Sequence, residues 1–338
     1  MAVGISGYGV YVPRLRIKRE DYAKAWGSFS ATGVSEKAVM GYDEDVLTMA
    51  SKVSRRALDS IPLPASKVTR FALASTSPPY AEKLLSGTVL VSLGIPSDAF
   101  SSDHTSSTRA GTEAVIAGFE HLAGTPSGHV LVASADAPTA SMWSSVEHGL
   151  AAGAAAFVLS ASDIFAELEG HASWASEHAG ERFRPRGQEQ IHDLSVKKFS
   201  ESSFVANTTK AASAVLKRLG RKPEDYAHVV IQQPDARAPA SVAGKLGFTD
   251  AQLAAGLVSA YLGDLGAASV PLGLAAVLDV AKVGDRVLAV SYGSGAGADA
   301  LSFRVTADRK ASPSVKEEAA RKEYVDYVQY LKIKGAIQ

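Results

Sequence analysis

Short runs of β-branched residues alternate with longer Ala- and Leu-rich runs along most of the chain, and this alternation constrains the fold most. The short runs are typical of strands and the long ones of helices. Strand–helix–strand units in both halves predict an α/β fold with mostly parallel central sheets. The expected strands are Val3–Val12, Arg70–Ser75, His129–Ser134, Ala154–Ser160, His228–Gln232, Asp285–Ser291 and Ser302–Val305.

The longer runs predict helices, and the two segments without a clear period have separate interpretations. Ala267–Val280 is apolar on every side, which indicates a helix buried all round. Residues 170–204 are polar and irregular, as in a linker or an active-site flap. The tail from Lys316 is charged, then aromatic, and predicts a late-docking helix or strand. The other expected helices are Asp45–Ser60, Arg109–Leu122, Asn207–Leu219 and Ser241–Leu246.

Composition excludes several classes of protein. The 35 basic and 35 acidic side chains balance, which argues against binding nucleic acid or an anionic membrane by bulk charge. The 338 residues contain no cysteine, so disulfides, thiolate metal sites and a cysteine nucleophile are excluded. The eight histidines form no HxH or HxxxH pair, and no metal site is expected. Without a signal peptide or a long apolar run, the sequence predicts a cytoplasmic protein with no membrane contact.

One polar segment before an expected helix contains candidate nucleophiles. Within 101–114, Ser106, Ser107 and Thr108 stand at the mouth of the helix that begins near Arg109, with Asp103 and His104 just before them. A helix N-terminus stabilises an anion and lowers the pKa of a nucleophile. Ser, Thr and Asp are also the preferred capping residues, so an ordinary N-cap cluster is the simpler interpretation.

A second candidate is the glycine-rich turn SYGSGAGAD at 291–299, with Gly293 and Ser294 at its centre. Such a turn can aim backbone N–H groups at an oxyanion or a phosphate. It is not the dinucleotide fingerprint, because a strand-like run follows it instead of a helix. A tight hairpin is the simpler alternative.

Three further polar residues follow apolar segments. Gln232 ends a strand and can form hydrogen bonds, but it cannot act as an acid or a base. Arg237 is either a phosphate ligand or a solvated surface charge. Asp264 lies between two glycines before the buried helix, where it is either a cap or a buried functional carboxylate.

Together these segments resemble archaeal and bacterial 3-hydroxy-3-methylglutaryl-CoA synthases. The similar stretches extend nearly end to end: MAVGISGYGVYVPRLRIK, GYDEDVLTMA, VVIQQPDARAP, KLGFTDAQ, AVLDVAKVGDRVLAVSYGSGAGADAL and YVDYVQYLKIKG. The resemblance implies the thiolase fold, with two similar βαβ-rich halves in a five-layer αβαβα arrangement, usually dimeric. The halves are expected at 1–165 and 166–338.

The resemblance also identifies positions where this chain departs from the family. The family's acyl-accepting cysteine aligns with Thr108, its acid–base glutamate with Thr76, its histidine with Gln232 and its asparagine with Asp264. A threonine hydroxyl is a poor substitute for a thiolate. Condensation of acetyl-CoA by the family mechanism is therefore not expected.

At the coenzyme A site the departures are fewer. Arg237 matches a lysine of that site and Ser294 matches the serine of the glycine-rich turn, whereas an arginine aligns with Ser241. The resemblance implies no required cofactor, with coenzyme A entering only as part of an acyl-CoA substrate.

Three functions fit this pattern. The first is a subunit of a multi-component acyltransferase, in a homodimer or beside a cysteine-bearing thiolase-like chain and a small OB-fold/zinc-ribbon protein. The second is a cysteine-independent aldolase on an acyl-CoA, with Asp264, His104 or Tyr80 as base and Gly293–Ser294 holding the enolate oxygen. The third is an acyltransferase that acylates Ser107 or Thr108, with His104 as its base.

Overall fold

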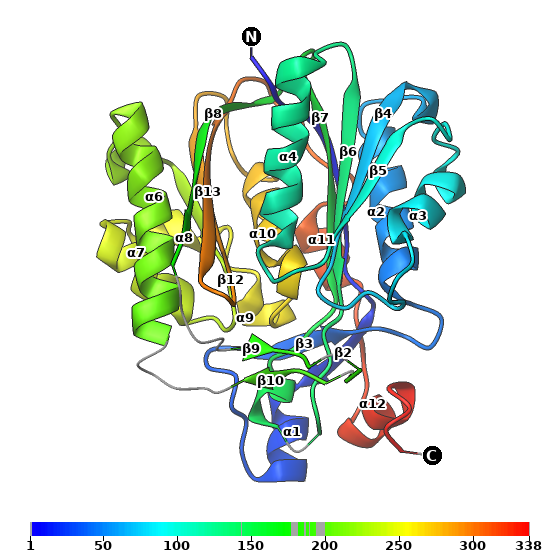
Figure 1. The fold of residues 1–338 in the computed structure, drawn as a ribbon. Coiled ribbons are helices and arrows are strands. Elements are labelled where there is room, and N and C mark those ends of the chain that lie inside the picture. The colour runs from blue at the N-terminus through cyan, green and yellow to red at the C-terminus, as the bar shows by residue number, and fades with distance from the viewer. Residues whose placement is uncertain are drawn as a thin grey trace.

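A computed structural model describes residues 2–142, 144–176, 182–185, 187–188, 190–193 and 200–337. Among them, nine strands form one sheet in the order β11-β12-β13-β8-β1-β7-β6-β4-β5 (Figure 1). Their bounds are β1 Gly4–Tyr11, β4 Val68–Ala74, β5 Phe100–His104, β6 His129–Asp136, β7 Gly153–Ser160, β8 Ala166–Ala175, β11 His228–Ile231, β12 Arg286–Gly293 and β13 Gly297–Val305.

The expectation of mostly parallel sheets is wrong. β4 pairs in parallel with β5 and β6, and β11 with β12, but the other neighbouring pairs of described strands in this sheet are antiparallel. The three residues between β12 and β13 are far too few for the crossover that a parallel pair needs. The expected hairpin at the glycine-rich turn is confirmed, because Gly293 pairs with Gly297 across it.

Helices lie outside the strands and between them, which gives the expected five layers (Figure 1). α2 and α3 cover one side of the N-terminal strands, α4 and α10 fill the middle, and α6, α7 and α8 cover the C-terminal strands. The bounds are α1 Arg19–Trp26, α2 Val46–Asp59, α3 Leu85–Leu93, α4 Ala110–Gly124, α6 Ala206–Leu219, α7 Ala238–Leu246, α8 Asp250–Ala254, α9 Ser259–Leu262, α10 Ser269–Leu278, α11 Val315–Ala320 and α12 Tyr327–Ile333. No helix of the described part is long and apolar enough to cross a membrane.

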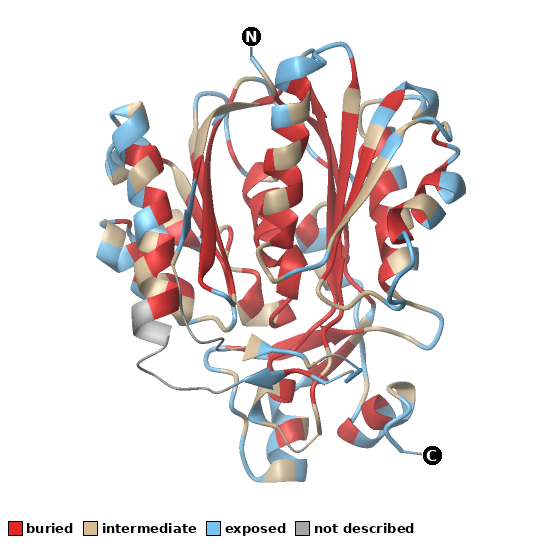
Figure 2. Ribbon diagram, in the orientation of Figure 1, coloured by how far each residue is buried: buried red, intermediate tan, exposed pale blue. Residues whose placement is uncertain are grey.

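Within the middle layer, α10 is buried along its whole length, whereas α4 has some exposed residues (Figure 2). All ten residues of α10 are buried, as the apolar sequence predicted. α4 packs close to it, and a Cβ at Gly111 would lie 2.3 Å from the carbonyl oxygen of Ala267. A glycine at 111 is therefore required for this close approach of the two backbones.

The stretch expected to be irregular from Gly170 begins instead as the second half of β8. Its polar residues alternate beside β13, where Leu168 pairs with Phe303 and Ala172 with Ala300. Half-buried side chains such as Glu169 ion-pair across the sheet, which explains why the run lacks a strongly apolar pattern. Residues 177–181 and 194–199 of that stretch lie outside the described residues.

A smaller module below the main sheet joins the two ends of the chain. β2 (Leu15–Lys18) pairs with β3 (Glu36–Val39) and also with β14 (Glu323–Tyr324). α12 packs its buried Tyr327 and Tyr330 against Tyr22 of α1. The tail thus contains both helix and strand and docks on the N-terminal 40 residues.

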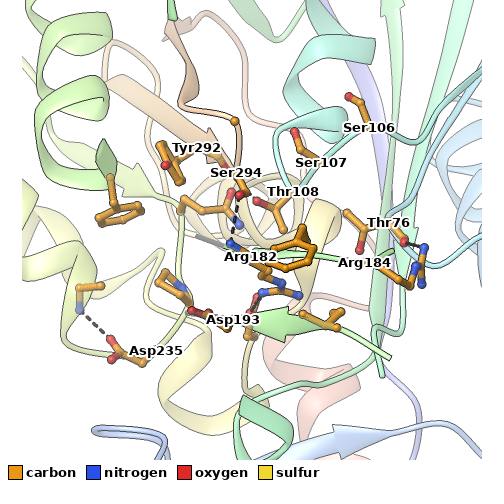
Figure 3. A pocket seen from close by; sticks show the side chains of 18 of the residues that line it. Thr76, Ser106, Ser107, Thr108, Arg182, Arg184, Asp193, Asp235, Tyr292 and Ser294 are labelled. Carbon is orange, nitrogen blue, oxygen red and sulfur yellow. Dashed lines mark hydrogen bonds and ion pairs between the residues drawn. The ribbon is translucent and has the colours of Figure 1, made fainter. Parts of the chain in front are cut away.

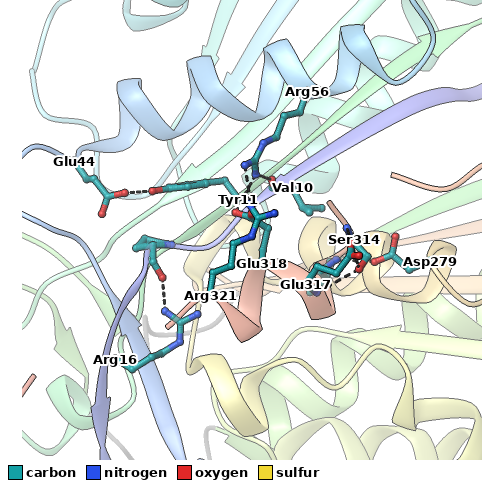
Figure 4. Close-up of polar contacts among 12 residues, drawn as sticks. Val10, Tyr11, Arg16, Glu44, Arg56, Asp279, Ser314, Glu317, Glu318 and Arg321 are labelled. Carbon is teal, nitrogen blue, oxygen red and sulfur yellow. Dashed lines mark hydrogen bonds and ion pairs between the residues drawn. The ribbon is translucent and has the colours of Figure 1, made fainter. Parts of the chain in front are cut away.

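The helix α11 is fixed to the main body by one buried and one half-buried carboxylate (Figure 4). Glu318, 3% exposed, pairs with Arg56 of α2 at 2.9 Å. Asp279, at the end of α10, accepts a hydrogen bond from the Val315 backbone N–H at 2.8 Å. Ser314 caps the same helix end by accepting from the Glu317 N–H. These contacts hold α11 against β1.

A buried ion pair links the smaller module to η2 (Ser145–His148). Lys37 Nζ lies 3.1 Å from Glu147 Oε1, and neither side chain is more than 1% exposed. Tyr22 and Tyr330 donate their hydroxyls to the same carboxylate oxygen. Burial lowers the pKa of Lys37 to about 8, against the attraction of Glu147, which raises it.

We expect Glu147→Gln to destabilise the fold by about 3–5 kcal/mol at pH 6, because it leaves Lys37 charged and buried without a counter-ion. In the variant, the pKa of Lys37 falls further below the ordinary lysine value. At pH values between these two pKa values, the folded variant binds fewer protons than the unfolded chain. Its stability therefore rises with pH between 6 and 9 more than that of the wild type. Urea unfolding at pH 6 and pH 9 measures the loss of stability in the variant. An equal loss at the two pH values would contradict the pairing of Lys37 with Glu147.

Candidate active site

A cavity of about 760 Å³ opens where several strands end (Figure 3). β4, β5, β11 and β12 each lead directly into a loop that lines it. The carboxyl ends of sheet strands are the usual place for ligand sites in α/β folds. The lining residues are Thr76, Thr105, Ser106, Ser107, Thr108, Arg182, Phe183, Arg184, Ile191, Asp193, Phe204, Gln232, Pro234, Asp235, Ala238, Asp264, Tyr292, Ser294 and Gly295.

The candidate nucleophiles lie on the turn between β5 and α4, at the wall of this cavity. Thr108 Oγ1 donates a hydrogen bond to the carbonyl oxygen of Tyr292 at 2.7 Å. The hydroxyl proton is therefore directed to a backbone carbonyl and not to a base. Within the described residues, no His or carboxylate forms a hydrogen bond with the hydroxyl of Thr108 or Ser107.

The glycine-rich turn packs directly against this loop. A Cβ at Gly293 would lie 2.1 Å from Ser107 Oγ and 2.9 Å from the Cβ of Arg109, so only glycine fits. Behind the loop, Arg109 Nε pairs with the fully buried Asp299 at 2.8 Å. Asp299, on β13, also accepts from Thr112 of α4 and Ser173 of β8. It thereby joins α4 to β13 and β8.

Thr76 is fixed by a buried carboxylate that the sequence analysis did not identify. Asp136, fully buried at the end of β6, accepts from the Thr76 hydroxyl at 2.7 Å and from its backbone N–H. It also accepts from the hydroxyls of Ser75 and Ser77 and from the N–H of Ala267, before α10. Asp136 therefore ties the 75–77 turn to the middle layer.

Gln232, Asp264 and Arg182 surround the turn that precedes α10. Gln232 Nε2 donates to the Gly266 carbonyl at 3.1 Å, and Asp264 Oδ1 accepts from the Gly266 N–H at 2.9 Å. Asp264 Oδ2 pairs with Arg182 Nη1 at 2.5 Å. Asp264 is thus both a local cap and a buried carboxylate of the cavity, neutralised by a guanidinium.

Several predicted residues lie elsewhere. His104 stands on β5, 3.5 Å from Glu113, and Tyr80 is 51% exposed; neither lines the cavity. Arg237 is exposed at the start of α7, beside the lining residue Ala238. Asp103 caps α3 through the N–H groups of Leu85 and Ser86. No group of His, Asp and Glu in the described ranges could hold a metal ion.

The sequence analysis missed Arg182 and Arg184, which cross the cavity from β9 (Arg182–Phe183). The Arg182 N–H donates to Ser294 Oγ at 3.1 Å, and Arg184 donates to the Thr76 carbonyl oxygen at 2.5 Å. These two contacts connect one short segment to opposite walls. The available signal was a pair of arginines in the stretch already considered as a flap.

Sequence comparison relates the whole chain to known enzymes. It is 34% identical to hydroxymethylglutaryl-CoA synthase of Methanococcus maripaludis, over 99% of both chains. It is 33% identical to hydroxymethylglutaryl-CoA synthase of Archaeoglobus fulgidus, again over 99% of both. The chain belongs to the hydroxymethylglutaryl-CoA synthase family. Residues 216–305 also match the family model of the 3-oxoacyl-[acyl-carrier-protein (ACP)] synthase III C terminal.

Solved structures agree on the fold of this hydroxymethylglutaryl-CoA synthase relative. A structure of MvaS in complex with 3-hydroxy-3-methylglutaryl coenzyme A has a TM-score of 0.89 at 20% identity, covering 98% of this chain and 91% of that one. A structure of HMG-CoA synthase complexed with CoA has a TM-score of 0.87 at 19% identity, covering 98% and 90%. The thiolase fold implied by the sequence resemblance is therefore confirmed.

Asp136→Asn tests the role of the buried carboxylate. In either orientation the new amide NH₂ faces a backbone N–H that can only donate, of Ala137 or of Thr76 and Ala267, so we expect a loss of about 3 kcal/mol in the free energy of unfolding. Asp103→Asn is the matched control, because it alters only the cap of α3 and should cost about 1 kcal/mol. Urea unfolding measures both losses, and equal values would contradict a special role for Asp136.

Proposed function

We propose that this chain is a cysteine-free, acyl-thioester-binding subunit of a multi-component acyltransferase and does not itself form an acyl-enzyme. The proposal rests on one observation: at the wall of an open cavity, the Thr108 hydroxyl donates its hydrogen bond to the Tyr292 carbonyl. The family membership supplies the class of reaction, the condensation of acyl-CoA substrates. The acyl-accepting step would belong to a cysteine-bearing, thiolase-like partner.

The chemistry of the site supports the loss of acylation. A hydroxyl nucleophile needs a neighbouring base that removes its proton as it attacks. Gln232 cannot remove a proton, and the Thr76 hydroxyl is itself donated to Asp136. The positions that would carry acid–base chemistry in the family therefore hold groups that can only form hydrogen bonds.

The preserved cavity supports binding. Its walls offer hydroxyls, amides and two arginines to a polar ligand, and the glycine-rich turn keeps its close approach to Ser107. Relatives of the same fold bind CoA and 3-hydroxy-3-methylglutaryl-CoA. Arg237 is exposed next to the lining residue Ala238, which supports the expectation from the resemblance that it binds a CoA phosphate.

The edge of the sheet supports a subunit role. β5 is the terminal strand of the sheet, and its outer backbone groups have no neighbouring strand in the described chain. Phe100 on β5 is 57% exposed, and Val91 on the adjacent α3 is 71% exposed. An exposed edge strand with large apolar side chains favours pairing with another chain. A second chain of the same fold would extend the sheet there.

A cysteine-independent aldolase is the second candidate, because Asp264 lies in the cavity as that reaction requires. Its ion pair with Arg182 argues against a free base, since a base must give up that partner to accept a proton. Under the aldolase hypothesis, Asp264→Asn abolishes turnover of an acyl-CoA without unfolding the protein. Under our proposal, the pure chain shows no such turnover.

Acylation and binding are separable by experiment. After incubation with acetyl-CoA, we expect the intact mass of the pure protein to show no acetyl adduct, while calorimetry shows that CoA thioesters bind. Thr108→Val should leave the affinity within about two-fold, because the hydroxyl proton is already donated to the Tyr292 carbonyl. An adduct that is lost in this variant would refute the proposal.

Native mass spectrometry of the protein from its own host tests the assembly. We expect a complex with a thiolase-sized chain and a small third chain. Phe100→Asp should weaken the pairing of β5 by at least ten-fold, because it places a charge at the sheet edge. Val283→Asp is the control, since this apolar residue is also exposed, at 60%, but precedes β12 far along the chain. A monomer at all concentrations would contradict the subunit role.

A further inference from the structure

Arg182 is held in the cavity by both its backbone and its side chain (Figure 3). Its N–H donates to Ser294 Oγ, and its Nη1 pairs with Asp264 Oδ2. The side chain is only 17% exposed. An arginine held at its backbone and at one guanidinium nitrogen is pre-organised and binds a further acceptor at little entropic cost.

Two polar atoms around the same turn have no partner in the described protein. Arg182 Nη2 is a buried donor without an acceptor, and Gln232 Oε1 is a buried acceptor without a donor. The Gln232 amide cannot simply rotate, because its Nε2 is bonded to the Gly266 carbonyl. An unpaired buried polar atom costs about 1–3 kcal/mol, and a ligand that supplies the missing partner removes that cost.

The two atoms are complementary in type. A hydroxyl both accepts and donates, so it can satisfy a guanidinium N–H and an amide oxygen together. A ketone can satisfy only the arginine, and an alkyl group satisfies neither. A carboxylate is disfavoured, because Asp264 already neutralises Arg182 and a second anion would be repelled by it.

We propose that Arg182, positioned by Asp264, and Gln232 select a short acyl thioester that carries an uncharged hydroxyl on its acyl chain. This inference rests on the proposed function, since it requires that the cavity binds a thioester. It assigns Arg182 to specificity, and it makes Asp264 a positioning residue in place of a base.

The test compares CoA thioesters of similar size by calorimetry on the full chain. We expect 3-hydroxybutyryl-CoA to bind at least ten-fold tighter than butyryl-CoA, with acetoacetyl-CoA between them. Succinyl-CoA should bind no better than butyryl-CoA. A wild-type protein that binds these thioesters with equal affinity would overturn the inference and leave the proposed function intact, whereas no binding of any thioester would overturn both.

Variants then assign the selection to the named residues. Arg182→Gln combined with Asp264→Asn removes both charges together, and it should bring the ratio of hydroxybutyryl to butyryl affinity to about one while butyryl-CoA still binds. Arg218→Gln, on the outer helix α6, should leave the ratio unchanged. If the double variant does not fold, Gln232→Met provides the second measurement, in which the same ratio should fall at least three-fold. A preserved ratio in a folded variant would refute the assignment.

Discussion

The middle layer of two helices between strands constrains everything around it. α10 has no solvent-facing side, so every residue in it must be apolar or small, and α4 can approach only where Gly111 meets the Ala267 carbonyl. The helix ends are the places where polar groups enter this layer. Asp136 accepts from the Ala267 N–H before α10, and Asp299 accepts from Thr112 in the first turn of α4. Both carboxylates lie directly behind the loops of the cavity. The rigidity of the site therefore derives from the way the buried helices begin.

The sequence predicted most of the regular structure because its elements have strong periods. The buried helix and the strands β6 and β7 follow from apolar patterns, and the hairpin follows from its clustered glycines. It did not predict the antiparallel pairing of β1 with β7, which depends on tertiary contacts and not on local sequence. β8 was missed because its outward residues are half-buried and charged. Short elements such as β2 and β3 carry too few residues to show a period.

The candidate site was predicted in part, for a chemical reason. Thr108, Ser107, Thr76, Gln232, Asp264 and Ser294 all line one cavity, although they are distant in sequence. Those positions came from the family resemblance and from glycine and capping signals. Arg182 and Asp136 carry no such signal. Arg182 lies in a polar stretch without a period, and Asp136 is a polar residue at the end of an apolar strand, which is a common position. Their importance is visible only in the partners that the fold brings to them.

The smaller module joins residues from both ends of the chain, and this has a consequence for synthesis. β2 is synthesised long before its partner β14 and the aromatic helix α12, because most of the described chain lies between them. Until then β2 has an open edge, and the buried charges of Lys37 and Glu147 lack the Tyr330 hydroxyl. Long-range pairing of this kind forms slowly and leaves apolar surface exposed in the interval. A nascent chain of this protein therefore exposes the edge of β2 until β14 has been synthesised.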